Sequence, residues 1–315
     1  MKKHSQNNVP VLMTFKDLGL LIGIPLATLT AWLLPEKFWS TLSKWVAPFA
    51  TSVISVKQGE LVHKIEVAAG KRKLTIAPKK IAINLVSCEI LKTFQNMRDF
   101  RPGHWTPEIE LIGLEHIESA LIKGRGAIIW DSHFYFANLV TKIALDRAGY
   151  GIHHLSHPEH GFSPSRFGIQ FLNPIRGNSE NHYLKERVVI NPDAPKAAMQ
   201  TLETRLNSNA IVSITVSDRG RRPIKVPFLN SEIHIAPGAQ LLAIKTGAAL
   251  IPVFTFQTSP LHYQVTLTPP LHIPETSCLD TAIAAITNSY VHQLEKKVLA
   301  CPAEWVGWMN VPLKN

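Results

Sequence analysis

The sequence predicts an α/β fold, in which a layered sheet with flanking helices follows an N-terminal membrane-anchor helix. From residue 127 onward, short apolar runs typical of buried strands alternate with segments whose apolar residues have helical spacing. Near the N-terminus, residues 18–34 carry no charge and are followed by clustered tryptophan and lysine side chains. We therefore divide the chain into a membrane anchor with an interfacial helix, residues 1–49, and an α/β domain, residues 50–315.

The composition narrows both the class of protein and the class of partner. The chain has 315 residues, of which 45% are hydrophobic and 18% are charged, below the roughly 25% charge usual for soluble domains. This composition excludes intrinsic disorder, and the single long apolar run excludes a polytopic membrane protein. The formal net charge is +10, and most of the excess lies in the half that contains the apolar run. That pairing favours an anionic membrane surface as partner, and we expect no nucleic-acid binding.

The uncharged stretch 18–34 is somewhat shorter than the roughly 20 residues that a bilayer span requires. A short span and a membrane-embedded anchor both remain open. The end of this stretch and the segment that follows combine aromatic and cationic residues, as at a membrane interface: Trp32, Lys37, Phe38, Trp39, Lys44 and Trp45. A signal peptide and an ordinary amphipathic helix packed on the domain are the alternatives. We expect membrane attachment.

The remaining elements follow from periodicity and stop signals. The helix at residues 134–147 places its apolar side chains at positions i, i+3, i+4 and i+7 and ends before Gly149. The pattern predicts helices at residues 81–94, 134–147, 237–246 and 278–299, and strands at residues 127–130, 210–216, 250–256 and 263–267. The basic segment 71–80 fits either lipid phosphates or a solvated turn.

His133 is the strongest candidate for a catalytic residue. It follows a predicted buried strand and precedes a helix, a junction where catalytic side chains often lie. Its imidazole titrates near neutral pH and suits a general base. Asn138 comes five residues later, so it approaches His133 only if His133 lies on the loop and Asn138 lies in the first turn of the helix. The alternative is a histidine that merely caps the helix.

A second candidate site directly follows the predicted strand 210–216. It consists of Asp218, Arg219, Gly220, Arg221 and Arg222. Arginine binds phosphate and carboxylate groups through two parallel hydrogen bonds, so this segment suits an anionic ligand. A solvated basic turn explains the same residues.

Neither a metal nor a cofactor is predicted. Four histidines crowd residues 153–160, but their spacing matches no helical metal pair, and Pro158 interrupts any helix there. Cys88, Cys278 and Cys301 are far apart, which argues against a zinc site and a disulfide framework. The glycines at 124 and 126 precede a strand, whereas a dinucleotide fingerprint follows one.

The order of motifs between residues 81 and 308 resembles the lipid A biosynthesis (lauroyl/myristoyl) acyltransferases of the lysophospholipid acyltransferase superfamily. The His133 segment is similar to the family's H-x4-D/E motif. Three later segments are similar to its D-x-G…VPFF block, its TGAxxVPV strand and its terminal APEQW: residues 218–228, 246–253 and 301–305. The resemblance implies transfer of an acyl group from an acyl carrier protein thioester to a lipid or glycolipid hydroxyl.

The resemblance also assigns roles to residues and a location to the protein. His133 would be the general base, and Arg176 matches a family arginine that binds substrate. The acidic partner of the base is replaced by Asn138, and Asp131 is a candidate substitute for it. The family implies lipid A and lipopolysaccharide biosynthesis at the inner (cytoplasmic) membrane, with the catalytic domain facing the cytoplasm.

Two further departures from the family bear on the substrate. His153 stands in place of an arginine of a Y-R-P-like turn, and residues 309–311 replace a terminal H-R-R. Fewer cations imply an acceptor that is less phosphorylated than lipid A. The alternatives are a catalytically weakened homologue that binds lipid, and transfer of an unusual group such as an amino-acyl group.

Overall fold

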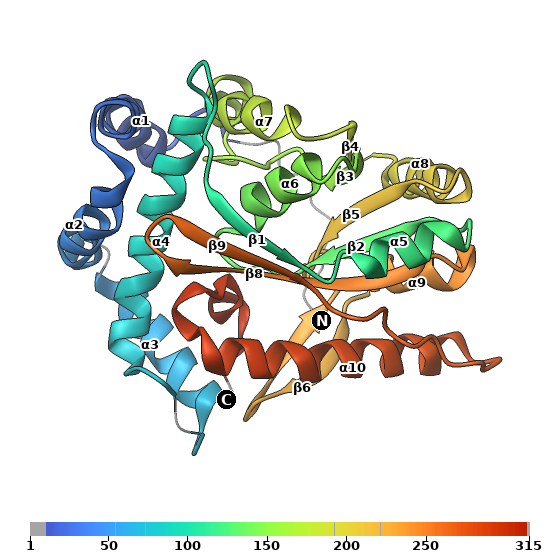
Figure 1. The fold of residues 1–315 in the computed structure, drawn as a ribbon. Helices are drawn as coiled ribbons and strands as arrows, with labels where there is room; N and C mark the ends of the chain where they lie inside the picture. The colour runs from blue at the N-terminus through green and yellow to red at the C-terminus, as the bar shows by residue number, and fades with distance from the viewer. Residues whose placement is uncertain (1–10, 54, 73, 192, 221, 314–315) are drawn as a thin grey trace.

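The computed structural model describes residues 11–53, 55–72, 74–191, 193–220 and 222–313. It confirms the α/β class: one mostly parallel sheet has the strand order β1-β9-β8-β2-β5-β3-β4, with helices packed against it (Figure 1). Its strands are β1 (Glu108–Ile112), β2 (Ala127–Asp131), β3 (Ile152–Ser156), β4 (Glu186–Val189), β5 (Ile211–Thr215), β8 (Ala249–Ser259) and β9 (His262–Leu267).

Strand direction determines which loops meet. Strands β8, β2, β5, β3 and β4 run the same way, because each neighbouring pair among them is parallel. Strand β9 is antiparallel to β8, and β1 is parallel to β9, so β1 and β9 run in the opposite direction. The carboxyl ends of the five parallel strands therefore lie at one edge of the sheet, where α/β proteins usually bind ligands.

The helices lie on both faces of the sheet. Figure 1 shows α6 above the sheet and α10 below it. The N-terminal helices are α1 (Phe15–Leu33), η1 (Glu36–Phe38), α2 (Trp39–Val53), α3 (Ser55–Ala69) and α4 (Pro78–Asp99). The later ones are α5 (Glu115–Ile122), α6 (Ala137–Arg147), η2 (Gly168–Leu172), α7 (Asn173–Asn181), α8 (Pro195–Asn207), α9 (Gly238–Thr246), α10 (Leu279–Ala300), η3 (Pro302–Glu304) and η4 (Val306–Asn310).

All eight elements predicted from periodicity are present. Helix α6 begins three residues later than predicted, because Phe134 and Tyr135 pair with residues 304–305 and Phe136 is the N-cap of the helix. A separate hairpin of β6 (Ile224–Phe228) and β7 (Ser231–Ile235) was not predicted. Its turn begins at Leu229, which has a φ of 53°, a value uncommon for a residue with a side chain.

The uncharged stretch forms α1, and this helix is fastened to α4. The indole of Trp32 donates a hydrogen bond to the carbonyl of Met97 at 2.8 Å. The guanidinium of Arg98 donates to the carbonyls of Ala31 at 2.6 Å and Leu34 at 3.2 Å, and it lies 5.2 Å from the ring of Trp39. The predicted domain boundary after residue 49 falls inside α2 and stays a prediction.

Because Arg98 joins α4 to the elbow between α1 and α2, its removal should loosen this contact. We expect Arg98→Ala to lower the free energy of unfolding by about 1–3 kcal/mol, since three carbonyl and aromatic contacts of a mostly buried charge are lost. Denaturant unfolding followed by tryptophan fluorescence measures the change. The matched control is Arg101→Ala, an exposed arginine with one long contact to Trp32. Equal stability of the two variants would contradict the prediction.

Candidate active site

His133 lies on the loop between β2 and α6, at the carboxyl edge of the parallel strands. Strand β2 is fully buried along its length, and the backbone NH of Ser132 continues its pairing by donating to the carbonyl of Val253. Asn138 is the second residue of α6. The structure therefore meets the geometric condition derived from the sequence: His133 lies on the loop, and Asn138 lies in the first turn of the helix.

The end of the chain holds the His133 loop in place. The backbone NH of Tyr135 donates to the carbonyl of Glu304 at 3.0 Å, and the backbone NH of Val306 donates to the carbonyl of His133 at 3.1 Å. Phe134 and Trp305 form an antiparallel bridge between these two hydrogen bonds. This role of residues 304–306 could not be predicted from the sequence, because the two segments are about 170 residues apart in the chain.

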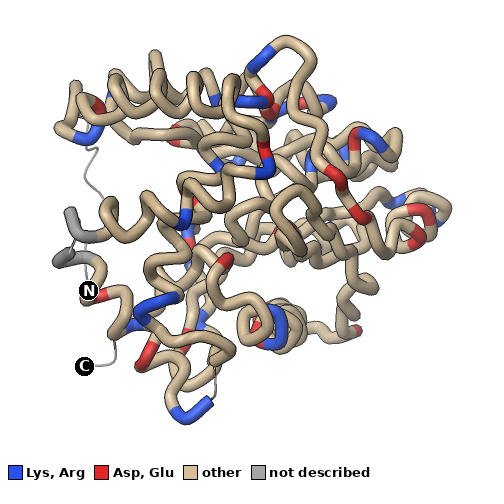
Figure 2. Tube along the Cα trace, turned by 60° about the vertical axis from the view of Figure 1, so that its left-hand side comes forward, with Lys and Arg blue, Asp and Glu red and all other residues tan. Residues whose placement is uncertain are grey.

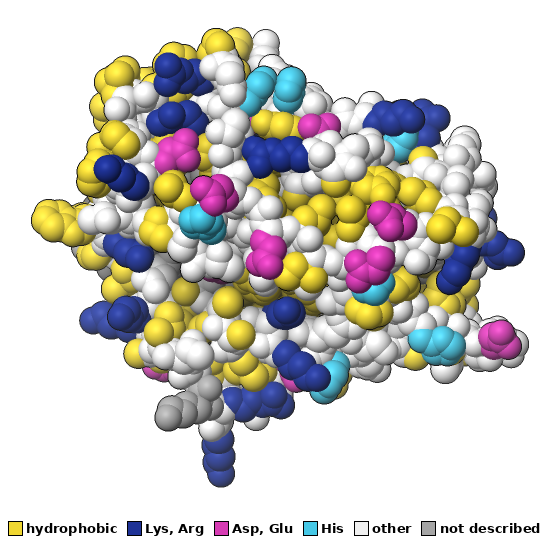
Figure 3. All heavy atoms as spheres, in the orientation of Figure 1, with side chains coloured by type: hydrophobic (Ala, Val, Ile, Leu, Met, Phe, Trp, Pro, Cys, Tyr) yellow, Lys and Arg dark blue, Asp and Glu magenta, His cyan; other side chains and the backbone are white. Residues whose placement is uncertain are grey.

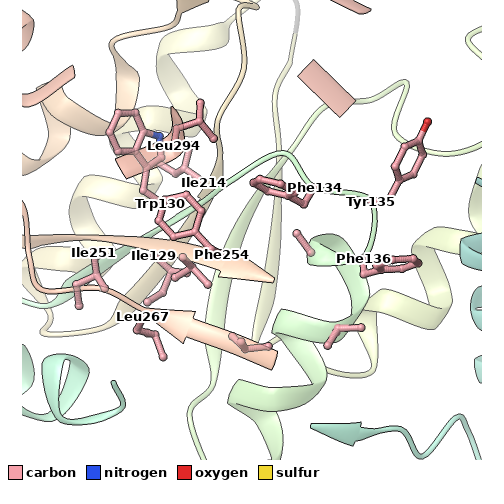
Figure 4. Packing of buried hydrophobic residues seen from close by; sticks show 14 of the residues in the cluster. Ile129, Trp130, Phe134, Tyr135, Phe136, Ile214, Ile251, Phe254, Leu267 and Leu294 are labelled. Atoms are coloured by element: carbon pink, nitrogen blue, oxygen red, sulfur yellow. The ribbon is translucent and has the colours of Figure 1, made fainter. Parts of the chain in front are cut away.

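Aromatic packing fixes the same loop from behind. Phe134 packs edge-on against Phe256 with 4.8 Å between ring centroids, and Phe136 packs against Tyr263 at 5.6 Å. Trp305 contacts Phe228 at 4.7 Å, so two of the conspicuous sequence motifs meet behind the loop. Figure 4 shows Phe134 and Phe136 on the loop that leads into α6. The backbone of His133 is thus held independently of its side chain.

Three cationic side chains lie near the imidazole of His133. Burial lowers the pKa of His133 to about 4, and the positive charges of Lys92, Arg176 and Arg219 act in the same direction, opposed by Glu89. Lys92 of α4 pairs with Glu89 at 2.5 Å, and its ammonium lies 5.0 Å from the ring centre of Tyr135. The imidazole is neutral at neutral pH and surrounded by positive charge. This arrangement can accept a proton and attract an anion.

Arg176 is held in this group by a buried carboxylate. Glu180 is fully buried and contacts four cationic or hydrogen-bonding side chains: Lys142 at 2.6 Å, His160 at 2.8 Å, Arg187 at 3.1 Å and the Nε of Arg176 at 3.2 Å. Burial alone would raise the pKa of Glu180, but its cationic neighbours hold it well below the usual value. The side chain of Arg176 is 8% exposed, and its hydrogen bond to Glu180 is made through Nε.

The segment after β5 contributes one predicted residue to this group. Arg219 forms an ion pair with Glu159 at 3.3 Å and lies close enough to His133 to lower its pKa. Asp218, Gly220 and Arg222 are exposed on the same turn, and Arg221 lies outside the described residues. Arg176 and Arg219 were predicted from the sequence. Lys92 was not, because one lysine on an amphipathic helix has the appearance of an ordinary surface charge.

The structure does not bring Asp131 or Asn138 into contact with the imidazole. Asp131 is buried at the end of β2, and its Oδ1 has no hydrogen-bond partner. Burial raises the pKa of Asp131 to about 7, opposed mainly by Lys142. Among the described residues, no hydrogen bond or ion pair joins either Asp131 or Asn138 to His133. Asp131 belongs instead to the polar interior around Lys142.

The histidines of residues 153–160 are dispersed among different partners. His153 pairs with Glu186 at 2.6 Å, His154 lies 3.1 Å from the hydroxyl of Ser213, and His160 contacts Glu180. The residues that the structure describes contain no group of three side chains arranged to hold a metal ion. These histidines bind the elements of the sheet edge to one another.

Comparison with known proteins supports the predicted resemblance. Residues 173–314 match the family model described as bacterial lipid A biosynthesis acyltransferase. The chain is also 24% identical over 195 residues to the phosphatidylinositol mannoside acyltransferases of two strains of Mycobacterium tuberculosis. That match covers 61% of this chain and 56% of each relative, so the chain spans just over half the length of these relatives. The resemblance to this acyltransferase family is confirmed.

The backbone carbonyl of Glu304 holds the His133 loop, and its buried side chain should make the free energy of unfolding depend on pH. Burial raises the pKa of its side chain to about 8, although a hydrogen bond from the backbone NH of Gln257 opposes the shift. Between the unfolded value of about 4.5 and pH 8, the unfolded chain releases a proton that the folded chain keeps. The folded state should therefore lose up to about 1.4 kcal/mol of stability for each unit of rising pH.

Glu304→Gln removes this titration and keeps an acceptor for Gln257. We expect the variant to match the parent below about pH 4.5 and to become progressively more stable than the parent up to about pH 8. Denaturant unfolding at a series of pH values measures the difference. The exposed Glu115→Gln serves as the control. Parallel stability curves for the parent and Glu304→Gln would contradict the assignment of a raised pKa.

Proposed function

We propose that this lipid A acyltransferase-like protein moves an acyl group from an acyl carrier protein thioester to a hydroxyl of a membrane lipid or glycolipid, with His133 as general base. The observation that carries the proposal is the neutral His133 at the carboxyl edge of the sheet, on a rigid loop and beside three cations. The family match over residues 173–314 supports the reaction class.

The proposed reaction uses a single proton carrier. The Nε2 or Nδ1 of His133 removes the proton from the acceptor hydroxyl as its oxygen attacks the thioester carbonyl. The tetrahedral intermediate then collapses, the carbon–sulfur bond breaks, and the imidazolium returns the proton to the leaving thiolate. No covalent acyl-enzyme is required, because the acceptor oxygen attacks the thioester directly.

The cations favour an acceptor or donor that carries phosphate. Lys92, Arg176 and Arg219 would bind phosphate oxygens, and the negative charge would offset the field that lowers the pKa of His133. The base would then be strongest when the substrate is bound. The exposed Asp218, Gly220 and Arg222, together with Arg221, would extend this site along the loop after β5.

The acceptor that we propose is a phosphoglycolipid of the kind named for the relatives, phosphatidylinositol mannoside, which combines a phosphodiester with sugar hydroxyls. Lipid A is the second candidate, from the family that residues 173–314 match. The replacement of family cations at His153 and at residues 309–311 favours the acceptor with fewer phosphates. An acyl carrier protein donor fits the cytoplasmic side of the inner membrane, with α1 as the membrane contact.

The test of this proposal is the replacement of the base. We expect His133→Ala to reduce acyl transfer by about 10²–10⁴-fold and to leave the fold intact, because the loop is held through its backbone. Transfer of a labelled acyl group from acyl carrier protein to phosphatidylinositol mannoside or lipid A precursor measures the rate. His262→Ala, at the start of strand β9, is the matched control. Near-normal turnover in folded His133→Ala protein would overturn the role of His133.

Among the described residues, no carboxylate forms a hydrogen bond or ion pair with the imidazole of His133, which favours a second candidate function, a catalytically weakened homologue that binds lipid. Asn138→Asp discriminates between the two. A carboxylate in the first turn of α6 should raise the pKa of His133 and stabilise the imidazolium, which increases transfer roughly tenfold if the parent is weakened. Unchanged activity in Asn138→Asp, together with a loss in Asp131→Asn, would instead assign the acidic role to Asp131.

A further inference from the structure

One face of α1 is apolar and exposed along its whole length. Its side chains are spaced by three or four residues and therefore form one stripe on the helix: Phe15, Leu18, Ile22, Leu26, Leu29 and Leu33. The exposed fraction is 93% at Phe15, 69% at Ile22 and 79% at Leu33. The opposite face is buried against the domain, where Ile24 and Ala31 join the hydrophobic core.

The stripe continues past the elbow into the next helices. Phe38 of η1 is 48% exposed, and Trp45 and Val46 of α2 are 75% and 40% exposed. We call the exposed apolar side chains of α1, η1 and α2 the outer apolar face. Figure 3 shows hydrophobic side chains along the left edge of the molecule, where Figure 1 places α1 and α2. A soluble monomer rarely exposes an apolar surface of this extent without a partner.

Charge around the outer apolar face fits a lipid surface. No charged residue interrupts α1 after Asp17. Figure 2 marks the positions of the charged residues along the trace of the chain. Lys16 stands at the start of α1, and Lys37 and Lys44 lie beside the aromatic residues of η1 and α2. Apolar and aromatic side chains bordered by lysines are the pattern of a helix that lies in the headgroup region of an anionic bilayer.

Both ends of α1 form hydrogen bonds with the rest of the domain, and these bonds limit how the helix can be oriented in a bilayer. Before α1, the carbonyls of Val11 and Leu12 accept hydrogen bonds from the backbone NH groups of Arg166 and Phe167. At its other end, α1 is held by Arg98 and Trp32. A helix that crossed the bilayer would have to break these bonds and withdraw Ile24 and Ala31 from the core. By length and composition alone, α1 could cross a bilayer, so the contacts of its two ends and of its buried face carry the distinction.

We propose that the outer apolar face docks the protein on an anionic lipid bilayer with α1 lying in the plane of the membrane, and that α1 does not cross it. The loop that holds the start of α1 connects this surface to the candidate active site. Phe162 of the loop accepts a hydrogen bond from Lys16, and His160 contacts Glu180, which holds Arg176. A lipid acceptor would thus meet the cationic group from the membrane side. The inference stands on packing and does not depend on acyl transfer.

The first experiment measures binding of the full chain to vesicles of phosphatidylcholine and phosphatidylglycerol by flotation. We expect Ile22→Glu with Leu26→Glu to reduce the partition coefficient at least about tenfold, because two charges enter the lipid-facing stripe. The matched control is Ile122→Glu with Val189→Glu, two exposed apolar residues on other elements, which should bind as the parent does. Equal binding by the two double variants would overturn the assignment of the surface.

The second experiment determines whether α1 lies in the plane. Cysteines are introduced at Val11 and Lys37, one at each end of α1, in protein whose Cys88, Cys278 and Cys301 are replaced by serine. Bound to vesicles, both positions should react with a membrane-impermeant maleimide added outside. Labelling at only one end would show that α1 crosses the bilayer and would overturn the proposal. A dimer in lipid-free solution that Leu26→Glu disrupts, with vesicle binding unchanged, would assign the face to a second copy instead.

Discussion

The short antiparallel pairing between residues 133–135 and 304–306 is the constraint on which the candidate site depends. A loop after a buried strand is normally free to vary, because its backbone groups can bond to water. Here the carbonyl of His133 and the NH of Tyr135 are both bonded to the end of the chain. The imidazole is therefore presented from a fixed backbone, as a general base requires when its geometry must persist through the reaction.

The aromatic residues extend this constraint through the fold. Trp305 connects the His133 loop to Phe228 of the β6–β7 hairpin, while Phe134 connects it to Phe256 of β8. The two segments that resemble the acyltransferase family around Phe228 and Trp305 thus pack against each other behind the His133 loop. Both blocks therefore help to hold the loop that carries His133.

Buried charge is the second organising feature. A carboxylate as buried as Glu180 is stable only with several partners, and it has four. One of these partners is Arg176, so the ion pair that stabilises the buried Glu180 also holds a positive charge near His133. The net positive field lowers the pKa of His133 and fits a negatively charged ligand. The loop that brings His160 to Glu180 also forms hydrogen bonds with the start of α1. One loop therefore contacts both the buried charges around Glu180 and the helix that carries the outer apolar face.

The sequence by itself determined the α/β class, the strand before His133 and the apolar character of residues 18–34, because these depend on local periodicity and composition. Strand β3 was not predicted, because His153 and His154 interrupt its run of apolar residues. Both histidines are buried in the structure, where His153 pairs with Glu186 and His154 lies beside the hydroxyl of Ser213. Neither the position of Lys92 near His133 nor the pairing of residues 304–306 with the His133 loop could be predicted from the sequence. Contacts between distant segments follow from strand order and helix packing, so tertiary structure alone decided which charges surround His133 and that α1 lies along α4.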